Sequence, residues 1–253
     1  RLLYHIAGEK NYRLSEIYGG SKDNVIAMEA HASILAEPED CEEILAMIRD
    51  MESIWNAEFM GEEPGLTVKT ETEKVENIVV FSKGTTQKVV GYLTACPNGL
   101  KEYSRKVAGA TETSLNLGIL ELKEDALTSL TSIRSSVKTR KEDLCARVTM
   151  LVEMLGGEAE VEGDYPAWEY RTDSALRPQV EKVYEELFHK KPVFSTIHAG
   201  LECGLLSEKI PDLDCVSFGP DNFDIHTPKE HLSISSTARV WDFLVAFLQQ
   251  ANV

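Results

Sequence analysis

The chain has 253 residues, enough for one large or two modest domains, which excludes a miniprotein that depends on disulfides or a metal for its fold. Its composition, 43% hydrophobic and 27% charged with 16 Gly and 9 Pro, excludes disordered, collagen-like and coiled-coil classes. Because 42 acidic side chains stand against 26 basic ones, the net charge of −16 would repel nucleic-acid phosphates, and we expect no nucleic-acid partner.

Cysteine usage and hydropathy indicate the compartment. The five cysteines show no CxxC spacing, which is typical of reduced thiols in a cytoplasmic protein: Cys41, Cys96, Cys145, Cys203 and Cys215. No apolar run approaches the roughly 18 to 20 residues that span a bilayer, so no membrane partner is expected. The chain opens without Met on an uncapped helical pattern at Leu2, Leu3 and Ile6, from which we expect that its true beginning is missing.

The first 162 residues predict an α+β fold made of two repeated strand-strand-helix-strand units. The first unit has a hairpin in 12–36, a helix at about 39–59 that starts after Pro38, and a strand at 66–74. After an intervening helix at 85–96, the second has strands at 111–122 and 126–136, a helix ending at Gly156-Gly157, and a strand at 158–163. Such repeats favour an antiparallel sheet with helices on one face.

The pattern changes near residue 163. A helix carrying Leu176, Val180 and Leu187 is followed by β-rich runs at 192–200 and 214–219 and by a final helix striped at 240–248. Alternation of helix and strand favours a layered α/β unit with a parallel or mixed sheet. The sequence therefore predicts domains at 1–162 and 163–253.

Two loops of the second domain follow its predicted strands, where functional groups gather in α/β sheets. The first, HAGLECG at 198–204, has small residues that let a backbone approach a ligand carboxylate; a tight turn around a buried His198 is the alternative. Its Cys203 is better read as a small buried thiol than as a nucleophile.

The second loop, GPDNFDIHTPKEH at 219–231, places hard oxygen and imidazole groups together, which suits zinc or manganese: Asp221, Asp224, His226, Glu230 and His231. A solvated acidic loop is the alternative, because the spacing matches no sharp metal motif. The absence of GxGxxG, GxxxxGK[ST] and GxSxG removes the main support for dinucleotide, P-loop and α/β-hydrolase sites.

HAGLECG, a strand ending in SFGP and IHTPKEHLSISS together resemble the carboxyl-terminal part of the aminoacyl-histidine dipeptidases, the Xaa-His or β-Ala-His branch of the M20 metallopeptidases. The resemblance continues through GDYPAW, ATETSLNLGILE and CPNG, so it covers essentially the whole chain. It implies a zinc-dependent enzyme, with residues 1–162 as most of a lid domain and 163–253 as the last part of the α/β catalytic domain.

The resemblance also implies roles for four residues. His226 would be the last metal ligand of a centre that holds two zinc ions, with manganese or cobalt as alternatives. Arg134 would pair with the terminal carboxylate of a small dipeptide, and Asn24 and the Gly200 amide would contact the same substrate. A solvated edge charge at Arg134 and a simple turn at Asn24 are the alternative interpretations.

The family's other metal ligands, its general base and its lid histidine have no match here and would precede Arg1. The resemblance therefore implies no catalytic residue in this chain, no peptidase activity by itself and weak zinc affinity, so that the chain is metal-free unless loaded. The alternative is a non-catalytic module that forms oligomer contacts, and the lid leaves a homodimer open. Dipeptide preference, physiological metal, oligomeric state and the origin of the missing half are not specified by the sequence.

Overall fold

The computed structural model describes residues 1–253 except 60–61, 64, 124–125, 198–199, 226 and 251–253. The chain divides into two compact units, which are described separately: unit 1 comprises 1–99, 115–133 and 143–160, and unit 2 comprises 100–114, 134–142 and 161–253. The predicted boundary at 162/163 stays a prediction. In the described part, no helix is both long and apolar enough to cross a membrane.

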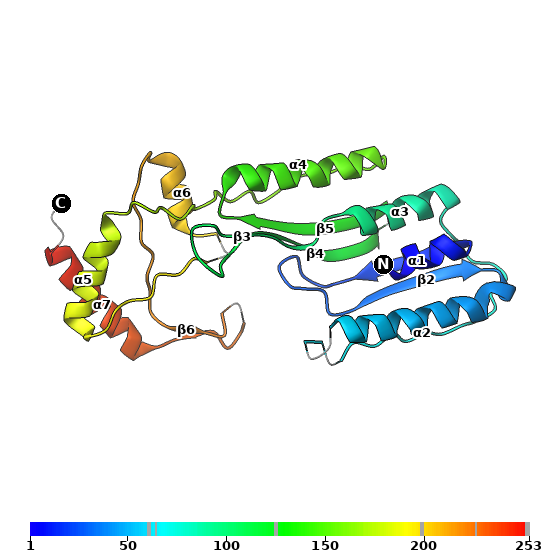
Figure 1. Ribbon diagram of the computed structural model, residues 1–253, viewed down its shortest axis with the longest axis horizontal. Coiled ribbons are helices and arrows are strands. Elements are labelled where there is room, and N and C mark those ends of the chain that lie inside the picture. Colours follow the sequence, from blue (N-terminus) through cyan, green and yellow to red (C-terminus); the bar gives the residue numbers. More distant parts are fainter. Residues whose placement is uncertain (60–61, 64, 124–125, 198–199, 226, 251–253) are drawn as a thin grey trace. The chain divides into compact units, whose positions relative to one another are not determined.

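Unit 1 is built on an antiparallel sheet with helices against it (Figure 1). Its own elements are α1 (Leu2–Glu9), β1 (Tyr12–Gly19), β2 (Ala30–Ala36), a 3-10 turn η1 (Pro38–Asp40), α2 (Cys41–Glu58) and α3 (Lys83–Ala95). Four elements contribute residues to both units: β3 (Gly99–Tyr103), β4 (Thr111–Lys123), β5 (Ala126–Ser135) and α4 (Lys138–Met154). The strand order is β2-β1-β4-β3, and β5 also pairs with β4.

A bulge in β1 decides which of its side chains enter the core. The β1–β2 ladder runs antiparallel from Tyr12 opposite Ala36 to Gly19 opposite Ala30, with a register shift between Leu14 and Glu16. Because the extra residue changes the phase of the alternation, Leu14 and Ile17 are buried while Glu16 faces solvent. A strict period of two would have buried the carboxylate instead.

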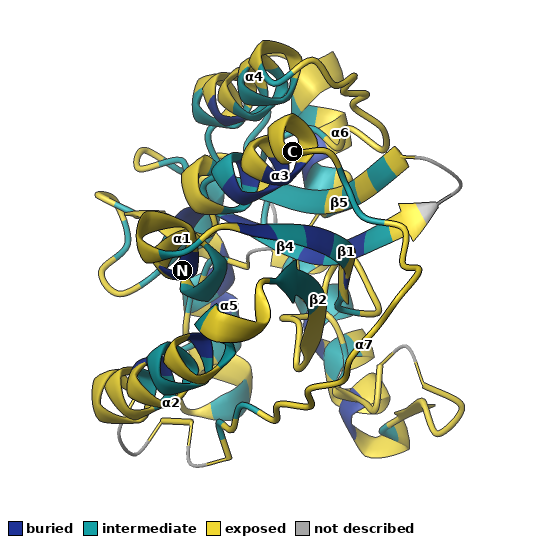
Figure 2. Ribbon diagram, turned by 90° about the vertical axis from the view of Figure 1, so that its right-hand side faces the viewer, coloured by how far each residue is buried: buried dark blue, intermediate teal, exposed yellow. Residues whose placement is uncertain are grey.

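The core of unit 1 lies between this sheet and three helices. Figure 2 shows buried residues along β1 and β4. The buried side chains come from α1, β1, α2, α3 and β4: Ile6, Tyr12, Leu14, Ile17, Ile44, Val89, Val90 and Leu120. The helix predicted at 39–59 is confirmed as α2, with Pro38 before it and acidic residues in its first turn, where they favour the helix dipole.

Unit 2 has a smaller core between two helices. Its own elements are α5 (Leu176–Phe188), α6 (Glu202–Lys209), β6 (Asn222–Phe223), β7 (His231–Leu232) and α7 (Ile234–Gln250). Val180 and Val183 of α5 pack with Phe243 of α7, whose ring also meets Tyr184 edge-on at a centroid distance of 5.6 Å. The two predicted helices of this half are therefore confirmed.

Four predicted strands are wrong: the segments 66–74, 158–163 and 214–219 form no strand, and neither do the described residues of 192–200, of which 198–199 are not described. Each lacks a ladder in the described part of the chain, and β propensity alone does not hold a strand without a neighbour. Phe194 and Val216 pack against the α5–α7 core, while Val193 is 91% exposed. The repeated strand-strand-helix-strand description is consequently not confirmed, whereas the antiparallel sheet with packed helices is.

The start of α5 is held by a carboxylate from a distant segment. Asp214 Oδ2 accepts hydrogen bonds from the Leu176 N–H and the Ser174 hydroxyl, both at 2.9 Å. Burial acts to raise the pKa of Asp214, but these hydrogen bonds, with Ala175 N–H and Arg171, bring the pKa below its ordinary value. The charged form therefore stabilises the folded state.

We predict that Asp214→Ala lowers the free energy of unfolding of unit 2 by about 1 kcal/mol at pH 7 because the helix loses its capping acceptor. Since the folded pKa lies below the unfolded value, this contribution is present above about pH 4 and is lost as the pH falls further. Urea unfolding between pH 7 and 2.5 measures it, with the exposed Asp173→Ala as control. A difference in the free energy of unfolding between wild type and variant that stays the same at low pH would contradict this prediction.

Candidate functional site

The segment 200–204 lies against the segment 165–167 at distances that only glycine permits. A Cβ added at Gly200 would lie 2.7 Å from the Tyr165 ring, and one at Gly204 would lie 2.6 Å from the carbonyl oxygen of Pro166. Real Cβ atoms do not approach so closely. The HAGLECG and GDYPAW motifs, more than 30 residues apart in the sequence, are thus brought together within unit 2.

A buried lysine fixes the other side of that segment. Lys141 of α4, whose side chain is 12% exposed, pairs with Asp164 and donates to the Tyr165 carbonyl at 2.6 Å. Burial, with Glu202 and Cys203 nearby, raises the pKa of Tyr165, so its hydroxyl stays protonated at neutral pH. The Gly200 loop therefore rests on a neutral, anchored ring.

Cys203 is not an activated thiol in this structure. Burial, with a smaller contribution from the neighbouring Cys215, raises the pKa of Cys203 above its ordinary value. Because the thiolate is the nucleophile, a raised pKa leaves little of the reactive form at neutral pH. This supports the small-thiol reading of the sequence.

Arg134 is the penultimate residue of β5 and is exposed. The strand end that carries it is anchored on both sides of the hairpin: Ser135 Oγ lies 2.8 Å from Thr113 Oγ1, and the Ser136 N–H donates to the Glu112 carbonyl at 3.1 Å. The Glu112 carboxylate, itself 8% exposed, pairs with Arg140 at 2.5 Å. The backbone at Arg134 is therefore held by a partly buried set of polar contacts.

Asn24 lies in an exposed turn of unit 1, in the loop between β1 and β2. The loop packs directly on β4: a Cβ at Gly118 would lie 2.5 Å from the Lys22 carbonyl oxygen and 2.6 Å from Asp23 Cα. Gly20, at φ +72°, makes a similar approach from the loop side. The loop and the strand are thus in contact backbone to backbone.

The acidic loop is organised as a β6–β7 hairpin, and its residue 226 lies outside the described residues. Three acidic side chains of the loop interact with other residues of unit 2: Asp221 with Arg239 at 3.6 Å, Glu230 with Asn222 at 3.0 Å, and Asp224 with His231 at 3.7 Å. The His231 ring also stacks on Phe223.

These engagements bear on metal binding. Among the described residues, no group of three or more His, Cys, Asp or Glu side chains could hold a metal ion. The described residues therefore do not fit a two-zinc centre by themselves. His226, expected from the sequence to be a metal ligand, lies outside the described residues.

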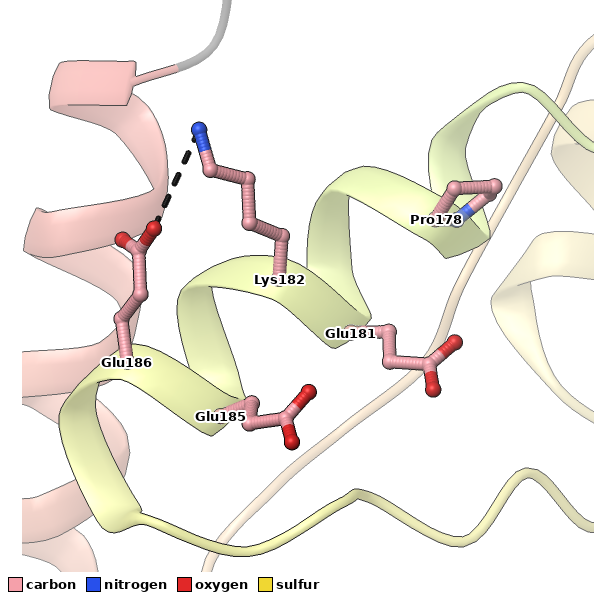
Figure 3. Close-up of a pocket in the computed structure, with 5 residues that line it drawn as sticks. All are labelled: Pro178, Glu181, Lys182, Glu185 and Glu186. Atoms are coloured by element: carbon pink, nitrogen blue, oxygen red, sulfur yellow. Dashed lines mark ion pairs between the residues drawn. The ribbon is translucent and has the colours of Figure 1, made fainter.

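One surface depression of about 400 Å³ lies beside α5 (Figure 3). It is lined by Pro178, Glu181, Lys182, Glu185 and Glu186, and the Lys182 ammonium lies 3.9 Å from Glu186. The figure shows these side chains projecting from one helix, with neither a nucleophile nor a base–acid pair converging. It contains none of the predicted site residues.

The predicted substrate residues divide between the units: Arg134 and Gly200 belong to unit 2, and Asn24 belongs to unit 1. Two supporting residues, Tyr165 under Gly200 and Asn116 under the Asn24 loop, were missed by the sequence analysis. Asn116 had a usable signal, since asparagine is depleted in strands and interrupts the apolar alternation of 115–120. For Tyr165, the only sequence signal was its place in the GDYPAW motif.

Comparison with known proteins gives consistent results. The sequence profile described as Peptidase family M20/M25/M40 matches residues 16–250. The chain is 29% identical over 250 residues, 99% of its length and 51% of the relative's, to the cytosol non-specific dipeptidase of Escherichia coli (strain K12).

Solved structures agree with this. A crystal structure of aminoacylhistidine dipeptidase from Vibrio alginolyticus matches with a TM-score of 0.89 and 31% identity, over 98% of this chain and 51% of that one. Aminopeptidase PepT from Bacillus cereus ATCC 10987, at 16% identity and a TM-score of 0.50 over 64% of this chain and 44% of that one, shares the fold alone. The chain thus spans about half the length of the relatives it matches.

Two helical glycines provide a matched test of the loop packing. Replacing Gly with Ala inside a helix normally stabilises by about 0.5–1 kcal/mol, which we predict for Gly91→Ala in α3, where a Cβ meets open space. Gly204→Ala in α6 should instead destabilise by about 1–3 kcal/mol, because the new Cβ collides with the Pro166 carbonyl. Urea unfolding measures both, and stabilisation by Gly204→Ala would refute the packing.

Proposed function

Because this chain belongs to peptidase family M20/M25/M40, we propose that it forms the lid and the last catalytic segment of a zinc-dependent dipeptidase that hydrolyses Xaa-His dipeptides. The observation that carries the proposal is the exposed Arg134 on an anchored strand end, in the same unit as the glycine-dependent loop at Gly200. A rigid cation and a closely approachable backbone suit a small anionic peptide.

Each proposed residue has one task in binding. The planar Arg134 guanidinium forms a bidentate pair with the terminal carboxylate of the dipeptide, which selects substrates with a free carboxyl end. The Gly200 amide donates a hydrogen bond to the substrate, and the Tyr165 ring, which fills the place of a Gly200 side chain, supports the loop that carries this amide. The Asn24 amide group contributes a further polar contact when the lid and the catalytic segment meet the same substrate.

The proposed metal role is limited to His226. Zinc, when bound in such a centre, lowers the pKa of a coordinated water so that hydroxide is available at neutral pH. The neighbouring carboxylates interact with Asn222, His231 and Arg239, so His226 would be the one ligand from this chain, and the other ligands would come from outside it. We therefore propose that the chain alone is inactive and binds zinc weakly, with manganese or cobalt as alternative metals.

Two further proposals accompany this function. None of the five cysteines forms a disulfide in the described part of the chain, which agrees with a reducing, cytoplasmic setting. The alternative function, a non-catalytic oligomerisation module, is supported by the position of β2 at the end of its sheet, where no described strand covers its outer side. A homodimer through this lid edge is compatible with the dipeptidase function and does not replace it.

We predict that Arg134→Ala lowers kcat/KM for β-alanyl-histidine about 100-fold in the intact zinc-loaded protein that carries this chain, mainly through KM, because a charged hydrogen-bonded pair is lost. The C-terminal amide of the dipeptide should be an equally poor substrate for wild type and variant. Arg147→Ala, which removes an exposed arginine paired with Asp143 at 2.8 Å, is the matched control. An equal loss on acid and amide would refute the carboxylate role.

We predict that His226→Ala in the same protein lowers hydrolysis of β-alanyl-histidine by more than about 100-fold and reduces bound zinc, because a metal ligand is removed. Zinc per chain is measured by elemental analysis, alongside the rate. His231→Ala is the control, since its imidazole stacks on Phe223 and meets the Lys229 carbonyl. Full activity and full zinc content in His226→Ala would remove the metal role.

A further inference from the structure

A single side chain holds the backbone on both sides of Asn24. The Asn116 amide of β4 donates one hydrogen bond to the Asp23 carbonyl at 2.9 Å and another to the Val25 carbonyl at 2.8 Å. Both lengths are typical of good hydrogen bonds. Because these two carbonyls flank residue 24, the Asn116 side chain fixes the loop on either side of that residue.

The two hydrogen bonds from Asn116 start from a part of β4 that is itself held in place by neighbouring segments. The neighbouring Leu117 N–H donates to Asn98 Oδ1 at 2.9 Å, so β4 is held from its other side at the same point. Two residues further along, Gly118 admits the loop backbone to a distance that any Cβ would forbid. The loop therefore has a defined seat on β4, made of two amide hydrogen bonds and one glycine.

Asn24 itself lies exposed in the turn that this seat holds. The residue is exposed, and no hydrogen bond joins its side chain to another residue that the structure describes. Fixing the neighbouring carbonyls restricts the dihedral angles of residue 24 and hence the direction of its Cα–Cβ bond. A polar group already oriented in this way loses less conformational entropy when it binds a ligand than one on an untethered loop.

We propose that Asn116 is a positioning residue that orients Asn24 for the substrate by holding the Asp23 and Val25 carbonyls. The inference rests on the proposed function, in which the Asn24 amide contacts the dipeptide. Asn116 acts through Asn24 and has no substrate contact of its own. The asparagine in TETSLNLGILEL thus has a role in preorganising the lid, beyond its place in a strand.

The test uses Asn116→Asp, which keeps the shape of the side chain but replaces the donating NH₂ with oxygen. In the intact zinc-loaded protein, we expect backbone amide exchange in residues 21–26 to rise about tenfold, with exchange in β1 unchanged. We expect kcat/KM for β-alanyl-histidine to fall about tenfold, and to fall less than twofold when the same change is made in an Asn24→Ala background. Asn116→Ala repeats both measurements without a new charge.

The matched control is Asn56→Asp, which removes an exposed amide that donates to the Glu52 carbonyl at 3.1 Å on α2. It should leave loop exchange and kcat/KM unchanged. Unchanged exchange in the Asn116 variants, or a full tenfold loss that persists in the Asn24→Ala background, would overturn the inference. Failure of the proposed function is distinguishable, because Arg134→Ala and His226→Ala would then keep wild-type hydrolysis while the exchange result stands alone.

Discussion

Backbone approaches closer than any Cβ allows hold both loops that carry the proposed substrate contacts. In unit 1 the Asn24 loop lies on β4 at Gly118, and in unit 2 the 200–204 loop lies on the 165–167 segment at Gly200 and Gly204. A side chain at any of these three glycines would collide with its neighbour, and at Gly118 and Gly204 that neighbour is backbone, which does not yield as a flexible side-chain end does. Placement of the polar groups on these loops depends on this constraint.

Hydrogen bonds and ion pairs from polar side chains then hold the segments that the glycines allow into contact. In unit 2, Lys141 ties the 164–165 segment to α4, and the buried Glu112 carboxylate, paired with the half-buried Arg140, supports the strand end that carries Arg134. A buried charge that lost its partner would be costly, so such pairs favour one arrangement over its alternatives. The acidic groups of the 221–231 loop interact with Asn222, His231 and Arg239, and the described residues form no metal centre.

Local patterns predicted the helices, whereas non-local pairing decided the strands. The spacing of apolar residues in 39–59 is read within a few turns and gave α2 correctly. The segment 192–197 alternates in burial as a strand does, yet it has no ladder, because a ladder needs a partner that one segment cannot specify. For the same reason, the sequence did not predict the supporting role of Asn116, whose hydrogen-bonded partners lie 91 and 93 residues away. The M20 motifs identified the family because a motif is recognised from the order of its residues alone, without knowledge of the fold.

We propose that, in the intact protein, Arg134, Gly200 and Asn24 contact one small peptide beside a metal ion that His226 binds. A crystal structure of the intact zinc-loaded protein with a phosphinate analogue of β-alanyl-histidine tests it most directly. The account predicts the Arg134 guanidinium about 3 Å from the analogue's terminal carboxylate, His226 on a zinc ion, and hydrogen bonds from Asn24 and the Gly200 amide. Arg134 and His226 directed into unrelated regions, with the analogue bound elsewhere, would contradict it.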